Sequence, residues 1–125
     1  MSSPVEPGRF GLSVLAGFAT SVAFHAALGW PFTVVGGGIG GYIARRYGWA
    51  SGLLAGGLSW AALALWSRSV DSRAVDEMLR VVGQLLGGGA PWMVLILTAA
   101  IGALLGASGG WVGANVRNLL GRVRR

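Results

Sequence analysis

Apolar residues dominate the chain in long runs, and charged residues interrupt these runs only at their edges. No Asp, Glu, Lys or Arg occurs between Phe10 and Ala44, between Trp49 and Ser67, or between Val81 and Val116. Charge-free apolar stretches of about 18 residues or more are typical of membrane-spanning helices. The sequence therefore predicts an all-α integral membrane protein.

The first apolar run is long enough for two helices. A single crossing needs about 20 residues, and the Trp30-Pro31 pair lies well inside the run from Phe10 to Ala44. Proline disfavours helix at the residue before it and suits the first turn of a new helix. We expect one membrane domain over residues 1–125, with four spanning helices at 9–29, 31–46, 49–67 and 91–116.

The polar connection between the last two spans has a helical pattern of its own. Apolar residues recur there at helical spacing: Val75, Met78, Leu79, Val82 and Leu86. This pattern predicts an amphipathic helix over residues 72–86 that lies flat on the outer membrane surface. The arginine-rich tail from residue 117 is expected to form a second interfacial element, on the inner face.

Charge sets the expected orientation. The net charge is +6, and all ten basic residues are arginine. With four spans, one side carries Glu6 and seven arginines, namely Arg9, Arg45, Arg46, Arg117, Arg122, Arg124 and Arg125. On the other side, three arginines balance three acids: Arg68, Arg73, Arg80, Asp71, Asp76 and Glu77. The positive-inside rule then predicts a multi-pass cell-membrane protein with both termini cytoplasmic. Anionic lipid headgroups, and not nucleic acid, are the expected partners of the arginine-rich face.

The aromatic residues suit the same topology. Trp and Tyr are enriched at both membrane interfaces. We expect Trp30, Trp66 and Trp92 at the outer interface, and Tyr47, Trp49 and Trp111 near the inner one. Trp60 falls inside a span, where we expect it to serve packing.

The glycines allow two interpretations. Gly36, Gly38 and Gly41 fit G-x-G-x-x-G after an apolar run, as in a dinucleotide-binding turn. That turn needs a strand before it and an acidic residue about 20 positions further on. The next acid after Glu6 is Asp71, so the required context is absent and the dinucleotide interpretation fails.

Small residues at four-residue spacing provide the better interpretation of the glycines. Helices in lipid associate where small residues let their backbones approach. Such faces occur on every span: Ser13, Gly17 and Ser21; Gly36, Gly40 and Ala44 with Gly37 and Gly41; Gly52 and Gly56; and Gly102, Gly106, Gly110 and Ala114. Shifted by 69 positions, Gly37, Gly40 and Gly41 also match Gly106, Gly109 and Gly110, which raises the possibility of a duplicated helical hairpin.

Two segments carry a resemblance to a known class of protein. GGGIGGYIARRYGWASGLLAGG (36–57) and AAIGALLGASGGWVGANVR (99–117) resemble uncharacterised, small, glycine-rich membrane proteins with four helices that are common in archaea. The resemblance implies a fold and no activity, and it assigns no functional residue.

Candidate chemistry is sparse. All four acids lie outside the expected spans, cysteine is absent, and His25 is the one histidine. We expect His25 to be neutral and hydrogen-bonded to a neighbouring helix; the alternative is a haem ligand or proton relay. The polar residues expected to form interhelical hydrogen bonds are Thr20, Thr33, Ser59, Thr98, Ser108 and Asn115. No catalytic, cofactor-binding or metal-binding residue is predicted.

Three functions remain open from the sequence. The first is a non-catalytic structural or accessory subunit that packs against a larger membrane complex or against itself. The second is a homo-oligomeric channel or small-solute transporter, although no ring of charges or broken polar helix supports it. The third is an enzyme or redox carrier centred on His25, which would require a bound cofactor.

Overall fold

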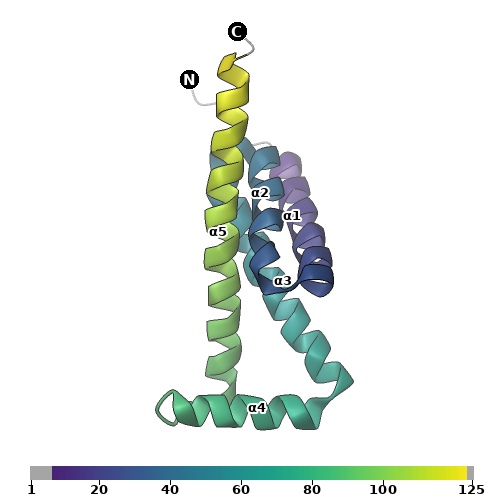
Figure 1. The fold of residues 1–125 in the computed structure, drawn as a ribbon, viewed down its shortest axis with the longest axis vertical. Coiled ribbons are helices and arrows are strands. Elements are labelled where there is room, and N and C mark those ends of the chain that lie inside the picture. The colour runs from purple at the N-terminus through teal and green to yellow at the C-terminus, as the bar shows by residue number, and fades with distance from the viewer. Residues whose placement is uncertain (1–6, 124–125) are drawn as a thin grey trace.

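The computed structural model describes residues 7–123, and every regular element in that range is a helix (Figure 1). Glu6, Arg124 and Arg125 lie outside the described residues. The elements are α1 (Pro7–Leu28), η1 (Trp30–Phe32), α2 (Thr33–Ala44), η2 (Arg45–Tyr47), α3 (Gly48–Val70), α4 (Ser72–Leu85) and α5 (Pro91–Val123). The prediction of an all-α fold is confirmed for these residues.

Three helical stretches are long and apolar enough to cross a membrane: Gly8–Leu28, Trp30–Val70 and Pro91–Val123. The second stretch has 41 residues, but it is not one straight helix. Its chain reverses at Arg45, which has a positive φ of 58° and donates its N–H to the carbonyl of Gly41. The stretch therefore folds back into α2 and α3, which pack against each other.

The long helices lie side by side in alternating directions (Figure 1). α1 and α3 run one way, and α2 and α5 run the other way. The start of α1 and the end of α5 lie at the same end of the bundle, which we call the terminal end, while α4 crosses the opposite end. This arrangement places the Ser72–Leu85 helix across the axes of α3 and α5, as the amphipathic pattern of residues 72–86 led us to expect.

The interior of the bundle is built from small residues. The largest fully buried side chains are those of Thr33, Ser13, Ser21, Ser51 and Ser59. Large apolar side chains point outward instead, and Leu104, for example, is 70% exposed. A water-soluble domain places its large apolar residues inside, so this distribution suits a chain whose outer surface meets lipid.

Helix α5 touches its neighbours through glycines on two faces. A Cβ at Gly106 would meet the Gly52 carbonyl of α3, and one at Gly110 would meet the Gly48 carbonyl. On the other face, a Cβ at Gly113 would meet the Gly38 carbonyl of α2. Backbone therefore lies against backbone at these positions, and a side chain larger than hydrogen would separate the helices.

The structure shows where the glycines of the G-x-G-x-x-G pattern and the arginine-rich tail lie. Gly36, Gly38 and Gly41 all lie within α2, after a 3-10 turn and not after a strand, so they form no dinucleotide-binding turn. The tail beyond Arg117 continues α5 without a break to Val123, where a separate interfacial element was expected. No proline interrupts it, and a single glycine such as Gly121 costs a helix only about 1 kcal/mol.

The expected outer belt of tryptophans does not lie at one level. Gly37 contacts Gly106, and Gly41 contacts Gly110, so α2 and α5 run parallel with a fixed offset. Trp30 is therefore level with about Ala99, roughly 10 Å short of Trp92 at about 1.5 Å per helical residue. α2, with 12 residues, is shorter than α3 with 23 and α5 with 33, in line with the short span expected at 31–46; the level of its first turn relative to Trp92 was not evident from the apolar pattern.

Candidate functional site

His25, the one candidate for cofactor chemistry, faces an aromatic ring. Its imidazole lies edge to face against Trp60 of α3, with 5.5 Å between the ring centroids. Its Nδ1 atom is enclosed and makes no hydrogen bond within residues 7–123. The expectation that a neighbouring helix would hydrogen-bond His25 is therefore wrong for Nδ1, because the neighbouring helix presents an indole ring whose N–H is directed to another residue.

The indole N–H of Trp60 is used elsewhere. It donates to the hydroxyl of Thr33, with 2.9 Å between Nε1 and Oγ1. His25, Trp60 and Thr33 thus tie α1, α2 and α3 together. Among the described residues, no group of three or more His, Cys, Asp or Glu is placed to hold a metal ion.

Buried serines provide two further links between helices. The hydroxyls of Ser13 in α1 and Ser51 in α3 lie 2.9 Å apart, fully buried. The Ser21 hydroxyl donates to the backbone carbonyl of Thr33 at 3.4 Å. Ser13 and Ser21 belong to the small-residue face expected on the first span, whereas Ser51 lies beside Gly52 and outside the face expected there. The hydroxyls of all three join neighbouring helices.

Most of the polar residues expected to bridge helices do not do so. Only Thr33 bonds to another helix through its hydroxyl. The other five donate to a carbonyl of their own helix, three or four residues earlier: Thr20, Ser59, Thr98, Ser108 and Asn115. That expectation is wrong for these five, since a short polar side chain on a helix can reach the preceding turn without a partner.

Arginines gather at the end of the bundle where the chain termini lie. Arg117 of α5 donates to the Tyr42 carbonyl of α2, with 2.6 Å between Nη1 and the oxygen, and its guanidinium lies 5.1 Å from the Tyr42 ring centroid. This carbonyl is one of the last four of α2, which have no partner within the helix. Arg45 of η2 and Arg9 of α1 are near enough to repel the charge of Arg117, so arginines of α1, η2 and α5 converge.

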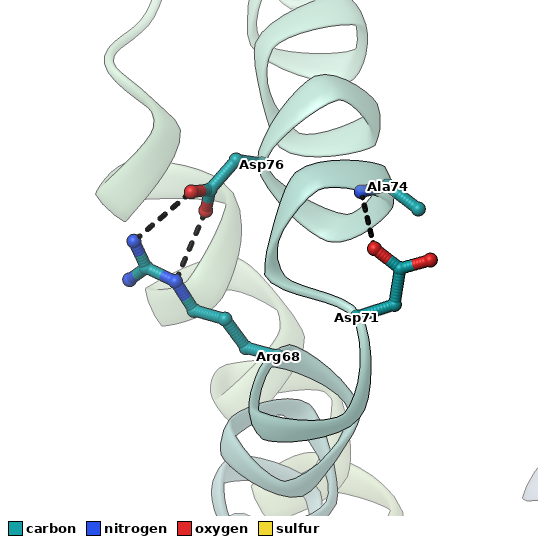
Figure 2. A network of polar contacts seen from close by, with 4 residues as sticks. All are labelled: Arg68, Asp71, Ala74 and Asp76. Atoms are coloured by element: carbon teal, nitrogen blue, oxygen red, sulfur yellow. Dashed lines mark hydrogen bonds and ion pairs between the residues drawn. The ribbon is translucent and has the colours of Figure 1, made fainter.

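The opposite end of the bundle is neutralised by ion pairs. Figure 2 shows Arg68, near the end of α3, reaching Asp76 of α4 with 3.0 Å between Nε and Oδ1. In the same view, the Asp71 carboxylate accepts a hydrogen bond from the Ala74 N–H at 3.0 Å and caps α4. Arg80 and Glu77 form a second ion pair, also at 3.0 Å.

The pairing of Arg117 with Tyr42 is the contact that the sequence did not reveal. The positive-inside pattern predicts that Arg117 and Tyr42 lie on the same side of the membrane. It does not predict that they touch, because the two residues are 75 positions apart in the sequence. Their contact depends on the parallel packing of α2 against α5. The offset of 69 between the glycines of these helices was the one signal that could have indicated this packing.

Helical stretches of spanning length, a core of small residues and an apolar exterior indicate a membrane protein of the helical class. Comparison with protein-family models, curated proteins and solved structures finds no match for the chain. The resemblance to small glycine-rich archaeal membrane proteins therefore stays an expectation.

Proposed function

We propose that this chain is a multi-pass cell-membrane protein with a structural or accessory role, and not an enzyme. The observation that carries the proposal is the use of its buried polar side chains. Ser13, Ser51, Thr33 and Trp60 hydrogen-bond across helices, and Ser59 bonds within its own helix. The buried serine and threonine hydroxyls and the Trp60 N–H are thus engaged within the bundle, and the enclosed Nδ1 of His25 is the exception among residues 7–123.

We further propose that α1, α2, α3 and α5 all span the membrane. α2 has 12 residues and η1 has three, which together cover about 24 Å at about 1.5 and 2.0 Å per residue. This is shorter than the roughly 30 Å of a hydrocarbon core. The shortfall is tolerable because α2 contacts α1, α3 and α5 and exposes little backbone to lipid.

The charge distribution favours cytoplasmic termini. Arg9, Arg45, Arg46, Arg117 and Arg122 lie at or beyond the ends of the proposed spans on the terminal side, and Arg68 and Arg80 at the other end are paired with acids. Cytoplasmic segments carry an excess of Lys and Arg. The terminal end would therefore meet the inner leaflet, and α4 would lie on the outer surface.

Partner binding would use the outward face and not the glycines. The glycines of α2 and α5 already contact other helices of the same chain. The remaining surface carries large exposed side chains such as Leu15 of α1, Leu58 of α3 and Leu104 of α5. A partner subunit would pack against one of these helix faces, while the other faces contact lipid.

The test is purification of the tagged protein from its own membranes under gentle extraction, with native mass spectrometry and an absorption spectrum of the same sample. We expect one larger membrane protein in fixed stoichiometry. Single substitutions Leu15→Trp, Leu58→Trp and Leu104→Trp serve as matched probes, and one of them should release the partner while the others retain it.

Two results would contradict the proposal. A haem or flavin absorbance that disappears in His25→Ala would indicate a redox protein. A closed homo-oligomer with no other protein, and with ion or solute flux after reconstitution, would indicate the channel or transporter.

A further inference from the structure

A basic hollow lies where α2 ends beside α5. Its larger part, about 370 Å³, is lined by Arg45, Arg117, Asn118, Gly121 and Arg122. An adjoining part of about 260 Å³ shares Arg45, Arg117 and Gly121 and adds Tyr42 and Leu120. We call the two parts together the arginine hollow.

Two of the three arginines of the hollow, Arg117 and Arg45, are constrained through the backbone. Arg117 is fixed by its hydrogen bond to the Tyr42 carbonyl and by the Tyr42 ring. Arg45 has a φ of 58°, in a region that is uncommon for residues other than glycine. This conformation ends α2 and leaves the Arg45 side chain lining the hollow.

No carboxylate among residues 7–123 balances these arginines. The acids in this range are Asp71, Asp76 and Glu77, which belong to α4 and its N-terminal cap at the opposite end of the bundle. Asp76 and Glu77 are already paired with Arg68 and Arg80. Like charges that face one hollow repel each other, so the hollow suits an anion supplied from outside the described chain.

An apolar groove leads into the hollow. It has a volume of about 460 Å³ and runs between α2 and α5, with Gly38, Ile39, Val112, Gly113 and Val116 among its lining residues. Its floor is formed where the Gly113 backbone contacts the Gly38 backbone. One helical turn further along α2 and α5, Tyr42 lines both the groove and the hollow.

We propose that the groove and the arginine hollow form one binding site for an anionic phospholipid. The headgroup phosphate would contact Arg45, Arg117 and Arg122, and an acyl chain would lie along the groove between α2 and α5. Arginine guanidinium groups bind phosphate through paired N–H donors, and basic pockets between spanning helices suit anionic headgroups. A free phosphate would use only the hollow, whereas a lipid uses both parts.

The inference rests on the proposed function, because it takes the terminal end of the bundle to face the inner leaflet. Binding itself is measured on delipidated protein in detergent, which has no leaflets. A failed lipid site and a wrong topology are therefore distinguishable.

Native mass spectrometry tests the site by titrating the protein with phosphatidylglycerol, with phosphatidylcholine of the same acyl chains, and with inorganic phosphate. We expect phosphatidylglycerol to bind about tenfold or more tightly than phosphatidylcholine. The double variant Arg45→Gly with Arg122→Gln should weaken phosphatidylglycerol binding by about tenfold or more. The control, Arg46→Gln with Arg80→Gln, removes the same charge outside the hollow and should change the affinity less than about twofold.

A groove variant separates a lipid from a free anion. A Cβ at Gly38 would lie 3.6 Å from the Gly109 carbonyl, an ordinary contact, and Gly38 lines the groove, so Gly38→Leu is the substitution chosen to occupy it. It should weaken phosphatidylglycerol binding by about tenfold, since the side chain takes space that the acyl chain needs. Retained binding in Gly38→Leu, competition by inorganic phosphate, or equal affinity for both lipids would overturn the proposal.

Discussion

Gly106 lies where α5 meets two other helices, with the Gly52 carbonyl of α3 on one side and Gly37 of α2 on another. Gly106→Ala places a methyl group against backbone that cannot rotate away, so the helices must separate. We expect a loss of about 1–3 kcal/mol in the free energy of unfolding, measured by circular dichroism during titration with a denaturing detergent.

The control for this prediction is Gly38→Ala, whose methyl group finds an ordinary contact at 3.6 Å. It should stabilise the helix by about 0.5–1 kcal/mol through backbone entropy. Equal effects of the two substitutions would contradict the view that backbone contact at glycine determines the stability of the bundle.

The second prediction for individual residues concerns the hydrogen bond between Ser13 and Ser51. Their hydroxyls bond across α1 and α3, and both side chains are fully buried. We expect a double-mutant cycle of Ser13→Ala and Ser51→Ala to give a coupling of about 0.6 kcal/mol in the unfolding free energy. The pair Thr20→Ala and Ser51→Ala is the matched control, because Thr20 bonds its own helix; a coupling as large in that pair would show that the assay does not report the interhelical bond.

At the scale of elements, the first turn of α4 depends on its N-cap. Asp71 caps the helix through the Ala74 N–H, and Asp71→Ala should destabilise its first turn by about 1 kcal/mol. Asp71→Asn keeps an acceptor oxygen and should not. Hydrogen exchange over Ser72–Val75 measures the effect, and faster exchange in both variants would show that the charge, and not the cap, is what matters.

The elements also show how far the sequence predicts this fold. The charge-free runs and Pro31 indicate where helices lie, because a membrane span must be apolar and proline starts a helix. The short second span was predicted at 31–46, close to the end of α2 at Ala44, but the contact of this helix with α5 was not. That contact is the hydrogen bond from Arg117 to the Tyr42 carbonyl, which joins two parallel helices that are far apart in the sequence.

The candidate site, too, could be predicted only in part from the sequence. The arginine asymmetry predicts a basic membrane face, which the structure resolves into a hollow beside an apolar groove. His25 was singled out because it is titratable, and its actual neighbour, Trp60, carries no polar group toward it. Which side chain meets a lone histidine is decided by the rotation of packed helices, and residue spacing does not determine that rotation.

At the scale of the whole molecule, the proposed topology has four membrane crossings, both termini inside and α4 outside. The chain has no cysteine, so single cysteines can be labelled without background. Leu28→Cys, Ser72→Cys and Gly121→Cys probe the α1–α2 turn, the start of α4 and the end of α5.

The most direct measurement is labelling of these three variants in intact cells with a maleimide that does not cross membranes. With the proposed topology, we expect Leu28→Cys and Ser72→Cys to be labelled from outside, and Gly121→Cys to be labelled only after permeabilisation. Labelling of Ser72→Cys and Gly121→Cys from the same side would contradict the topology. A Leu28→Cys that reacts only from inside, or from neither side, would contradict a full crossing by the α1–α2 hairpin.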